Sequence, residues 1–209
     1  MQIAILGTGT VGQALATGWL RAGHAIIFGS RQPDDDKAAA LMTLFEGKVQ
    51  IQATAAAIAA AGVVVLAVPW AAAEAVIAQG EDWAGKILID ATNPIAPGLQ
   101  LAVGKDNSGA EQVQTWATGA QVVKAFNTTG AENMLNPIYE GQATTMFIAG
   151  DDPAAKQVVK GLAEDLGFET ADTGNLQTAR FLEPLALAWI HLAIVQKQGR
   201  NIAFKLMKR

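Results

Sequence analysis

The chain contains no cysteine and only two histidines in 209 residues. Without cysteine it cannot form disulfides, thiolate zinc sites or iron–sulfur clusters, and it has no cysteine nucleophile. With only His24 and His191, a histidine-rich metal site is not expected either. These absences exclude most metal and thiol chemistry, and they fit a reducing, cytoplasmic compartment.

Charged residues are also scarce, at 16% of the chain, and they sum to a net charge of −4. A weakly acidic surface has no general attraction for nucleic acid or acidic lipid, so we expect neither as a partner. The longest apolar run, Leu185–Val195, is interrupted by His191 and falls short of the ~20 residues that a membrane span needs. We therefore expect a buried helix there, and no membrane segment. Because the first strand is expected to start at residue 2, we expect no signal peptide.

Short apolar runs alternate with helical segments along the rest of the chain. Uninterrupted runs of this length are typical of strands in a parallel sheet that is covered on both faces. The expected strands are Ile3–Leu6, Ala25–Phe28, Val63–Ala67, Ile87–Ile89 and Val122–Ala125, followed by 144–150 and 168–172. The expected helices cover 11–22, 36–45, 53–60, 70–78, 154–166 and a long stretch from 176 to about 206, kinked or restarted at Pro184. This alternation predicts an α/β fold of the doubly wound, Rossmann type, with a mostly parallel sheet, a C-terminal strand extension and a long C-terminal helix.

Three local motifs mark helix starts in the second half of the chain. Ser108 with Glu111 and Thr129 with Glu132 match a capping box, and Asp152 precedes a proline at the first helical position. No linker or repeat divides the chain. We expect residues 1–173 to form a dinucleotide-binding domain with its core in 1–128. Residues 174–209 are expected to form a helical segment for dimerisation and the acceptor site.

The most informative motif is the Gly-x-Gly-x-x-Gly pattern that follows the first strand. Gly7, Gly9 and Gly12 would allow, in that order, a tight turn, a close approach of the backbone to phosphate oxygens, and close packing of helix on strand. Free amides and the helix dipole then face the anion. In its strand–turn–helix context, the motif predicts a site for a dinucleotide pyrophosphate.

The end of the second strand predicts which dinucleotide binds. An acidic residue there selects NAD, whereas a hydroxyl with an arginine accommodates the 2′-phosphate of NADP. The strand ends in Ser30 and Arg31, close to the spacing from Gly12 that the motif requires. We therefore expect NADP(H), with Ser30 donating to the 2′-phosphate and Arg31 pairing with it. The acidic run Asp34–Asp36 could repel the phosphate, but we interpret it as capping and first-turn charge of the next helix, with Lys37 as an offset.

Four segments, spread over nearly the whole chain, resemble the NADP-dependent coenzyme F420 oxidoreductases and the cytoplasmic reductase domain of the STEAP metalloreductases. They are Gly7-Thr8-Gly9-Thr10-Val11-Gly12, Phe28-Gly29-Ser30-Arg31, Val122-Val123-Lys124-Ala125-Phe126-Asn127-Thr128 and Leu176–Glu183. The resemblance implies hydride transfer between NADPH and a flavin or deazaflavin, with F420, FMN or FAD as the co-substrate. The metalloreductases continue into haem-carrying membrane helices. We expect this chain, without them, not to carry electrons across a membrane by itself.

The resemblance also implies which residues contact the cofactor. Thr8, Gly9, Thr10 and Val11 would lie at the pyrophosphate, and Ser30 and Arg31 at the 2′-phosphate. On the ribose and nicotinamide side it implies Ala67, Val68, Pro69, Asn93, Pro94, Ala125, Phe126 and Asn127. Such positions are physically reasonable, because parallel sheets bind ligands at the carboxyl ends of their strands. Core packing of Val68 and Phe126, and turn formation by the two asparagines, are the alternative roles.

Hydride transfer to a flavin-type ring depends on proximity and stacking, and the cofactors supply the chemistry, so no catalytic side chain is required. A carbonyl or imine substrate would instead need a proton donor. Lys124 is the nearest candidate, although its side chain could equally point away from the site. Tyr139 has no lysine four residues later, as short-chain dehydrogenases require, and His191 lies in an apolar helix. Neither is expected to act as the acid.

Three functions remain open from the sequence. They are an NADPH-dependent reductase of a flavin or deazaflavin, a dehydrogenase or reductase of a small carbonyl or imine, and a non-catalytic NADP sensor. Enzymes of the second kind usually carry a longer helical C-terminal domain than the residues after Asp172 provide. The C-terminal helix is apolar nearly all round, so more than one of its sides is expected to be buried. We expect a homodimer through this helix, with the acceptor site near the interface.

Overall fold

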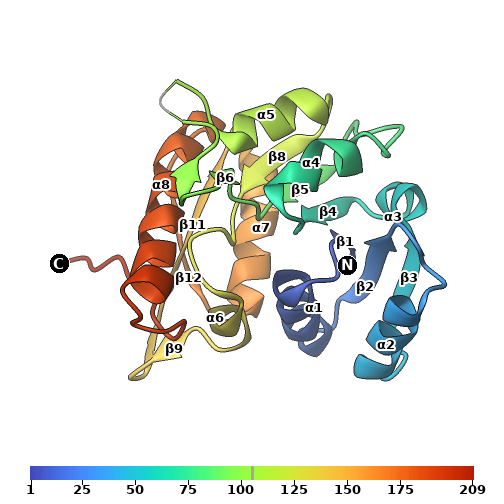
Figure 1. Cartoon of the computed structure of the whole chain (residues 1–209), viewed down its shortest axis with the longest axis horizontal. Coiled ribbons are helices and arrows are strands. Elements are labelled where there is room, and N and C mark those ends of the chain that lie inside the picture. Colours follow the sequence, from blue (N-terminus) through green and yellow to red (C-terminus); the bar gives the residue numbers. More distant parts are fainter. Residues whose placement is uncertain (105) are drawn as a thin grey trace.

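Eight strands form the central sheet of the computed structural model, which describes residues 1–104 and 106–209 (Figure 1). The strands are β1 (Gln2–Leu6), β2 (Ala25–Ser30), β3 (Val49–Ala53), β4 (Val63–Leu66), β5 (Ile87–Asp90), β8 (Gln121–Lys124), β11 (Thr145–Gly150) and β12 (Glu169–Asp172). Their order across the sheet is β12-β11-β8-β5-β4-β1-β2-β3. All neighbouring strands are parallel except β8 and β11, which are antiparallel. The predicted Rossmann-type sheet with a C-terminal strand extension is confirmed.

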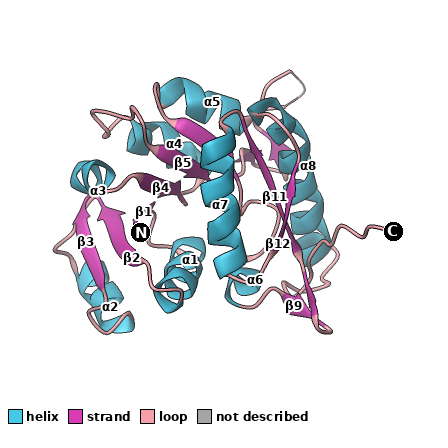
Figure 2. Cartoon of the chain, turned by 180° about the vertical axis from the view of Figure 1, so that it is seen from behind, coloured by secondary structure: helices cyan, strands magenta, loops and turns pink. Residues whose placement is uncertain are grey.

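Helices cover both faces of this sheet. They are α1 (Thr10–Arg21), α2 (Asp36–Leu44), α3 (Thr54–Ala60), α4 (Trp70–Ile77), α5 (Gly109–Trp116), α6 (Ala131–Leu135), α7 (Pro153–Asp165) and α8 (Ala179–Ile190). Buried residues of α1, α2, α6 and α7 belong to one core, and buried residues of α3, α4 and α5, with Ala179 at the start of α8, belong to the other. Figure 2 shows α7 and α1 side by side on the first of these faces.

The burial of β1 on both faces explains why apolar and polar residues do not alternate in its sequence. Ile3 and Ile5 point into one core, and Ala4 and Leu6 point into the other. All four side chains are fully buried. A central parallel strand has helices on both sides, so both of its faces must be apolar.

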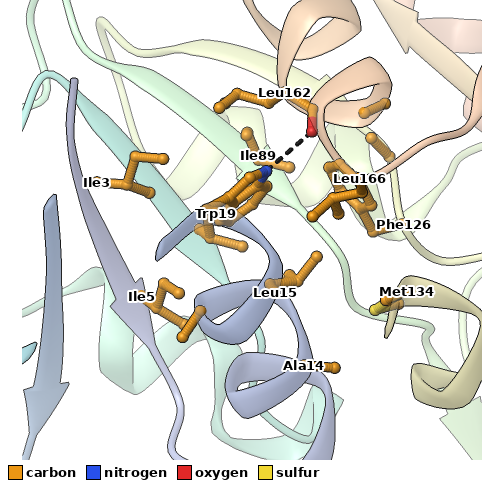
Figure 3. Close-up of a cluster of buried hydrophobic side chains, with 14 of the residues drawn as sticks. Ile3, Ile5, Ala14, Leu15, Trp19, Ile89, Phe126, Met134, Leu162 and Leu166 are labelled. Carbon is orange, nitrogen blue, oxygen red and sulfur yellow. Dashed lines mark hydrogen bonds between the residues drawn. The ribbon is translucent and has the colours of Figure 1, made fainter. Parts of the chain in front are cut away.

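The larger core is centred on Trp19 of α1 (Figure 3). Its indole Nε1 donates a hydrogen bond of 2.8 Å to the carbonyl oxygen of Leu162 in α7. Its ring meets the edge of Phe126 at 5.6 Å between centroids, with the planes 86° apart. This contact ties the first βα unit to the residues that follow β8, so the two halves of the sheet share one core.

Two of the three expected helix caps are confirmed. The Ser108 hydroxyl accepts from the backbone amide of Glu111, and the Asp152 carboxylate accepts from that of Ala155. The third expectation is wrong, because α6 begins after Gly130 and the Thr129 hydroxyl accepts from the side chain of Asn133 instead.

The edge strand β3 was not predicted. Its sequence, Val49-Gln50-Ile51-Gln52-Ala53, alternates apolar and polar residues. That alternation is typical of a half-exposed edge strand, whereas the prediction used uninterrupted apolar runs.

The C-terminal helix is shorter than predicted. A 3₁₀ turn (Leu176–Thr178) leads into α8, and a π-helical turn (His191–Val195) ends the helical stretch. Pro184 lies inside α8 and starts no new helix. After Val195 the backbone turns at Lys197 and Gly199, both of which have positive φ, and the rest of the tail forms no helix. The tail is held by contacts with the sheet: the backbone amide of Thr145, in β11, donates to the Phe204 carbonyl oxygen. These contacts take the place of the helix that was expected.

The helical stretch Leu176–Val195 has the length and apolar composition of a membrane span. However, its inward side carries Leu182, Ala186 and Trp189 in the protein interior, and Glu183 is 1% exposed. Buried charged and apolar side chains on one face indicate a helix packed in the α/β fold rather than one surrounded by lipid.

Candidate functional site

The glycine loop has the geometry that an anion site requires. Gly7 has a φ of +124°, and a Cβ there would lie 2.2 Å from the carbonyl oxygen of Ala67. A Cβ on Gly12 would lie 2.2 Å from the Gly7 carbonyl oxygen, whereas one on Gly9 would meet nothing within 4 Å. Gly9 is the N-cap of α1 and has no side chain to occupy the first free amides. The loop therefore packs tightly against the protein at Gly7 and Gly12, and it leaves free space at Gly9, in front of the first amides of α1.

A cavity of about 400 Å³ opens beside this loop, at the carboxyl ends of β1, β2 and β4. It brings together seven of the predicted residues: Gly7, Thr8, Ser30, Arg31, Ala67, Val68 and Pro69. It is also lined by polar residues that sequence reasoning did not assign to the site: Gln32, Asp35, Thr54 and Gln79. Lys37, which the sequence offered only as an offset to the acidic run, lines it too.

The end of β2 gives this cavity a positive character. Ser30 accepts from the amide of Gln32 through its hydroxyl oxygen, so its O–H remains free to donate. Arg31 is exposed and forms no ion pair within residues 1–104 and 106–209. Lys37 adds a second cation from α2. The one carboxylate in the lining, Asp35, accepts from the Ala38 amide at 2.8 Å and caps α2. Within the acidic run, Asp35 thus caps the helix and Asp36 lies in its first turn, as interpreted from the sequence.

The remaining residues of the glycine motif lie outside this cavity. Thr10 lines a second groove, of about 540 Å³, between α1 and α6. Val11 packs against the larger core, and Gly9 and Gly12 line neither hollow.

Asn93 and Asn127 form a linked pair at the ends of β5 and β8, also outside the cavity. The Asn127 amide donates to the side-chain oxygen of Asn93 at 3.1 Å, and the Asn93 amide donates to the backbone carbonyl of Asn127 at 3.0 Å. A second bond from the Asn127 amide reaches the Leu182 carbonyl of α8 at 3.1 Å. The Asn127 side-chain oxygen is buried without a donor. Such a pair could hold an amide-bearing ligand at this edge of the sheet.

Ala125, Phe126 and Pro94, which were also predicted to contact the cofactor, are buried. Phe126 is 1% exposed, and its ring packs on Trp19. Its φ is +60°, a region that disfavours bulky side chains, and its amide faces the sulfur of Met146 at 3.1 Å. The Phe126 ring therefore packs in the core, which is the alternative role stated from the sequence.

Lys124 is fully buried, and three groups hold its ammonium. Its Nζ lies 2.9 Å from the Asp90 carboxylate, 3.0 Å from that of Glu183 and 2.7 Å from the Thr92 carbonyl oxygen. Burial alone would lower the pKa of Lys124, but the two carboxylates outweigh it and raise the pKa above its ordinary value. A buried ammonium that keeps its proton is a poor general acid, so the candidate role of Lys124 as proton donor has no support.

Sequence reasoning missed the partners of this lysine. Asp90 ends β5, and its Oδ1 accepts from the amide and hydroxyl of Thr92. Glu183 interrupts the apolar face of α8 and accepts from the first amides of α5. The available signal was a charge inside each of three apolar segments, because buried charges are rarely left unpaired.

The chain is similar to proteins that are named for NADP and coenzyme F420. The profile of the family described as "NADP oxidoreductase coenzyme F420-dependent" matches residues 2–94. An F420-dependent NADP reductase of Methanothermobacter thermautotrophicus is 32% identical over 221 residues, covering 99% of this chain and 94% of that protein. Metalloreductase STEAP3 of Rattus norvegicus is 29% identical over 89% of this chain. The chain spans only 36% of that metalloreductase.

A solved structure is similar over its whole length. The crystal structure of a putative F420-dependent NADP-reductase from Arthrobacter sp. FB24 has a TM-score of 0.90 and 32% identity, and 99% of each chain is covered. The chain therefore belongs to the F420-dependent NADP reductase family and is an NADP-dependent oxidoreductase.

Proposed function

We propose that this family member transfers hydride between NADPH and a deazaflavin acceptor of the F420 type, with FMN or FAD as the alternative acceptors. The observation that carries the proposal is the 400 Å³ cavity, in which the glycine loop and the pair Ser30–Arg31 face one space. Relatives of nearly the same length are named for both NADP and F420.

The residues present fit the phosphate groups of NADP. The open amides after Gly9 suit the pyrophosphate, because an anion there completes the first turn of α1. Ser30, Arg31 and Lys37 suit the 2′-phosphate, with one hydroxyl donor and two cations. Selection of NADP over NAD follows, since the one carboxylate that lines the cavity, Asp35, is engaged in capping α2.

The nicotinamide end is assigned to the edge beyond Ala67, Val68 and Pro69, toward the pair Asn93–Asn127. When bound, the nicotinamide supplies the hydride from its C4. Asn93 and Asn127 offer amide groups to its carboxamide. The side-chain oxygen of Asn127, which accepts no hydrogen bond in the structure, could accept one from the carboxamide N–H after a small side-chain shift. The chain's part is to bind, orient and shield the two rings.

The state of the candidate acids favours a ring acceptor over a carbonyl or imine. Lys124 is enclosed by its partners, and Tyr139 donates its hydroxyl proton to Asn133 at 2.6 Å. Burial raises the pKa of Tyr139, which makes its hydroxyl a weaker acid. A deazaflavin or flavin can exchange its proton with solvent, and so it needs no positioned acid.

The test is to mix the protein with NADPH or NADH and, separately, with F420, FMN, FAD and a panel of small carbonyl and imine compounds. We expect nicotinamide absorbance to fall when NADPH and F420 are both present, and to fall faster than when NADH replaces NADPH. Turnover only with carbonyl or imine compounds would show instead a dehydrogenase or reductase of small carbonyl or imine substrates. Tight NADPH binding without turnover of any acceptor would favour a non-catalytic sensor.

We further propose a homodimer that buries the outer side of the C-terminal helix, and a cytoplasmic location. Phe181 is 72% exposed, Ile194 51% and Val195 44%, which leaves apolar surface on this segment. The expectation of no nucleic-acid or membrane partner rests on the net charge of −4. Sedimentation at micromolar concentration should give twice the mass of one chain, and a single-chain mass would contradict the dimer.

A further inference from the structure

One buried charge cluster connects α8 to the ends of two strands. The Lys124 ammonium bridges the carboxylate of Asp90, at the end of β5, and the carboxylate of Glu183, in α8. The exposed fractions of these three side chains are 0%, 0% and 1%. The cluster therefore fixes the helix to the carboxyl edge of the sheet from inside the protein.

Glu183 also fixes α8 to α5, which lies beside it in Figures 1 and 2. Its Oε2 accepts from the Gly109 amide at 3.0 Å, and its Oε1 accepts from the Ala110 amide at 3.1 Å. These amides form the N-terminus of α5, whose dipole favours the extra negative charge of the cluster. Glu183 is thus shared by a helix N-terminus and the lysine at the end of β8.

The residue before Glu183 contacts the proposed nicotinamide edge. The Leu182 carbonyl accepts from the Asn127 amide at 3.1 Å, and that amide also donates to Asn93 at 3.1 Å. Asn127 is 4% exposed, so its side chain has little freedom to find another acceptor. The position of one turn of α8 therefore decides where the asparagine pair points.

We propose that Glu183 is a positioning residue for hydride transfer. It does not touch the cofactor; it holds Leu182 in place, and through Leu182 it sets the orientation of Asn127 and Asn93. The inference rests on the proposed function only in placing the nicotinamide at this asparagine pair. It predicts that Glu183 controls the alignment of the nicotinamide and leaves the binding of the 2′-phosphate, at the far end of the site, unchanged.

The variant Glu183→Gln removes the charge and keeps the shape. The remaining pair, Lys124 and Asp90, stays neutral overall, so no uncompensated buried charge is created. The new amide nitrogen must, however, face either the Lys124 ammonium or an amide of α5, and donor facing donor should shift this turn of the helix. Glu183→Asp keeps the charge but withdraws the carboxylate by one methylene, and it serves as a second variant if Glu183→Gln does not fold.

The matched control is Arg180→Gln, one turn earlier on the same helix. Arg180 also ties α8 to α5, through a two-bond contact with Glu111 at 2.7 and 2.9 Å. Both of these side chains are 24% exposed, and the pair has no link to the asparagines. The control removes a helix–helix ion pair without touching the proposed alignment.

The experiment measures four quantities for each folded protein: the melting temperature, the Kd for NADPH, the nicotinamide fluorescence of bound NADPH, and kcat and KM for the acceptor. For Glu183→Gln we expect kcat to fall about tenfold and the bound fluorescence to change, because a small misplacement of reacting groups slows transfer strongly. The Kd for NADPH should stay within about twofold. Arg180→Gln should lower only the melting temperature.

The outcomes separate the inference from the proposed function. A lower melting temperature with unchanged kcat and fluorescence in Glu183→Gln would overturn the inference, as would an equal loss of kcat in Arg180→Gln. If the wild type turns over no acceptor, the proposed function fails. The fluorescence of bound NADPH then still decides whether Glu183 aligns the nicotinamide.

Discussion

Replacing Arg31 with glutamine should weaken NADPH binding about tenfold and leave NADH binding unchanged. Arg31 lines the cavity beside Ser30, and it has no ion pair to lose in the part of the chain that the structure describes. The variant should therefore change the affinity for the nucleotide and leave the stability of the fold unchanged. A hydrogen bond between charged groups contributes about 1.5–3 kcal/mol. Because Arg31 is exposed and screened by salt, the lower end, about 1.5 kcal/mol or roughly tenfold in Kd, applies.

The assay is calorimetric titration of NADPH and NADH into wild type, Arg31→Gln and the control Arg21→Gln. Arg21 is also an exposed arginine, but it lies at the far end of α1, outside the 400 Å³ cavity. We expect the control to bind both nucleotides like wild type. The Arg31→Gln effect should shrink as salt is raised. Equal weakening of NADPH and NADH, or no weakening of either, would refute the assignment of Arg31 to the 2′-phosphate.

Three further predictions concern stability and the glycine loop. Lys124→Met should destabilise the protein by about 3–5 kcal/mol in urea denaturation, because it leaves two buried carboxylates without their cation; a smaller loss would show that the cluster is weakly coupled. The hydrogen bond from Arg180 lowers the pKa of Glu111, so the pair stabilises fully above the ordinary value of 4.5 and is lost as pH falls below it. The melting temperatures of wild type and Glu111→Gln should therefore differ at pH 7 and converge at low pH, and a constant difference would contradict this. Gly7→Ala should cost about 1–3 kcal/mol from backbone strain, before any clash. Gly9→Ala should keep wild-type stability but bind NADPH less tightly, and the reverse pattern would refute the loop geometry.

The part of the fold nearest the N-terminus could be predicted because its signals are local. The run Ile3–Leu6 is buried on both faces, and Gly7 to Gly12 mark the turn and the helix start in consecutive residues. The same holds for the position of Ser30 and Arg31 beside the loop, because the motif fixes their spacing from it. Strand β3 escaped prediction because an edge strand buries only one face.

The elements that were missed depend on contacts between distant segments. The tail after Val195 has apolar helix formers, yet it forms no helix and is held by hydrogen bonds such as that from Trp189 to the Ile202 carbonyl. The Lys124–Asp90 pair joins residues 34 apart, and Glu183 reaches an amide 74 residues away. No sequence pattern specifies such pairings, because the register between strands and helices decides which charges meet.

The most direct test of hydride transfer uses NADPH that carries deuterium on the transferred face of nicotinamide C4. The protein is mixed with this NADPH and F420, and the reduced acceptor is analysed by mass spectrometry. We expect one deuterium in each molecule of reduced F420, formed in step with the oxidation of NADPH. Oxidation of NADPH without deuterium in the acceptor, or no oxidation at all, would contradict it.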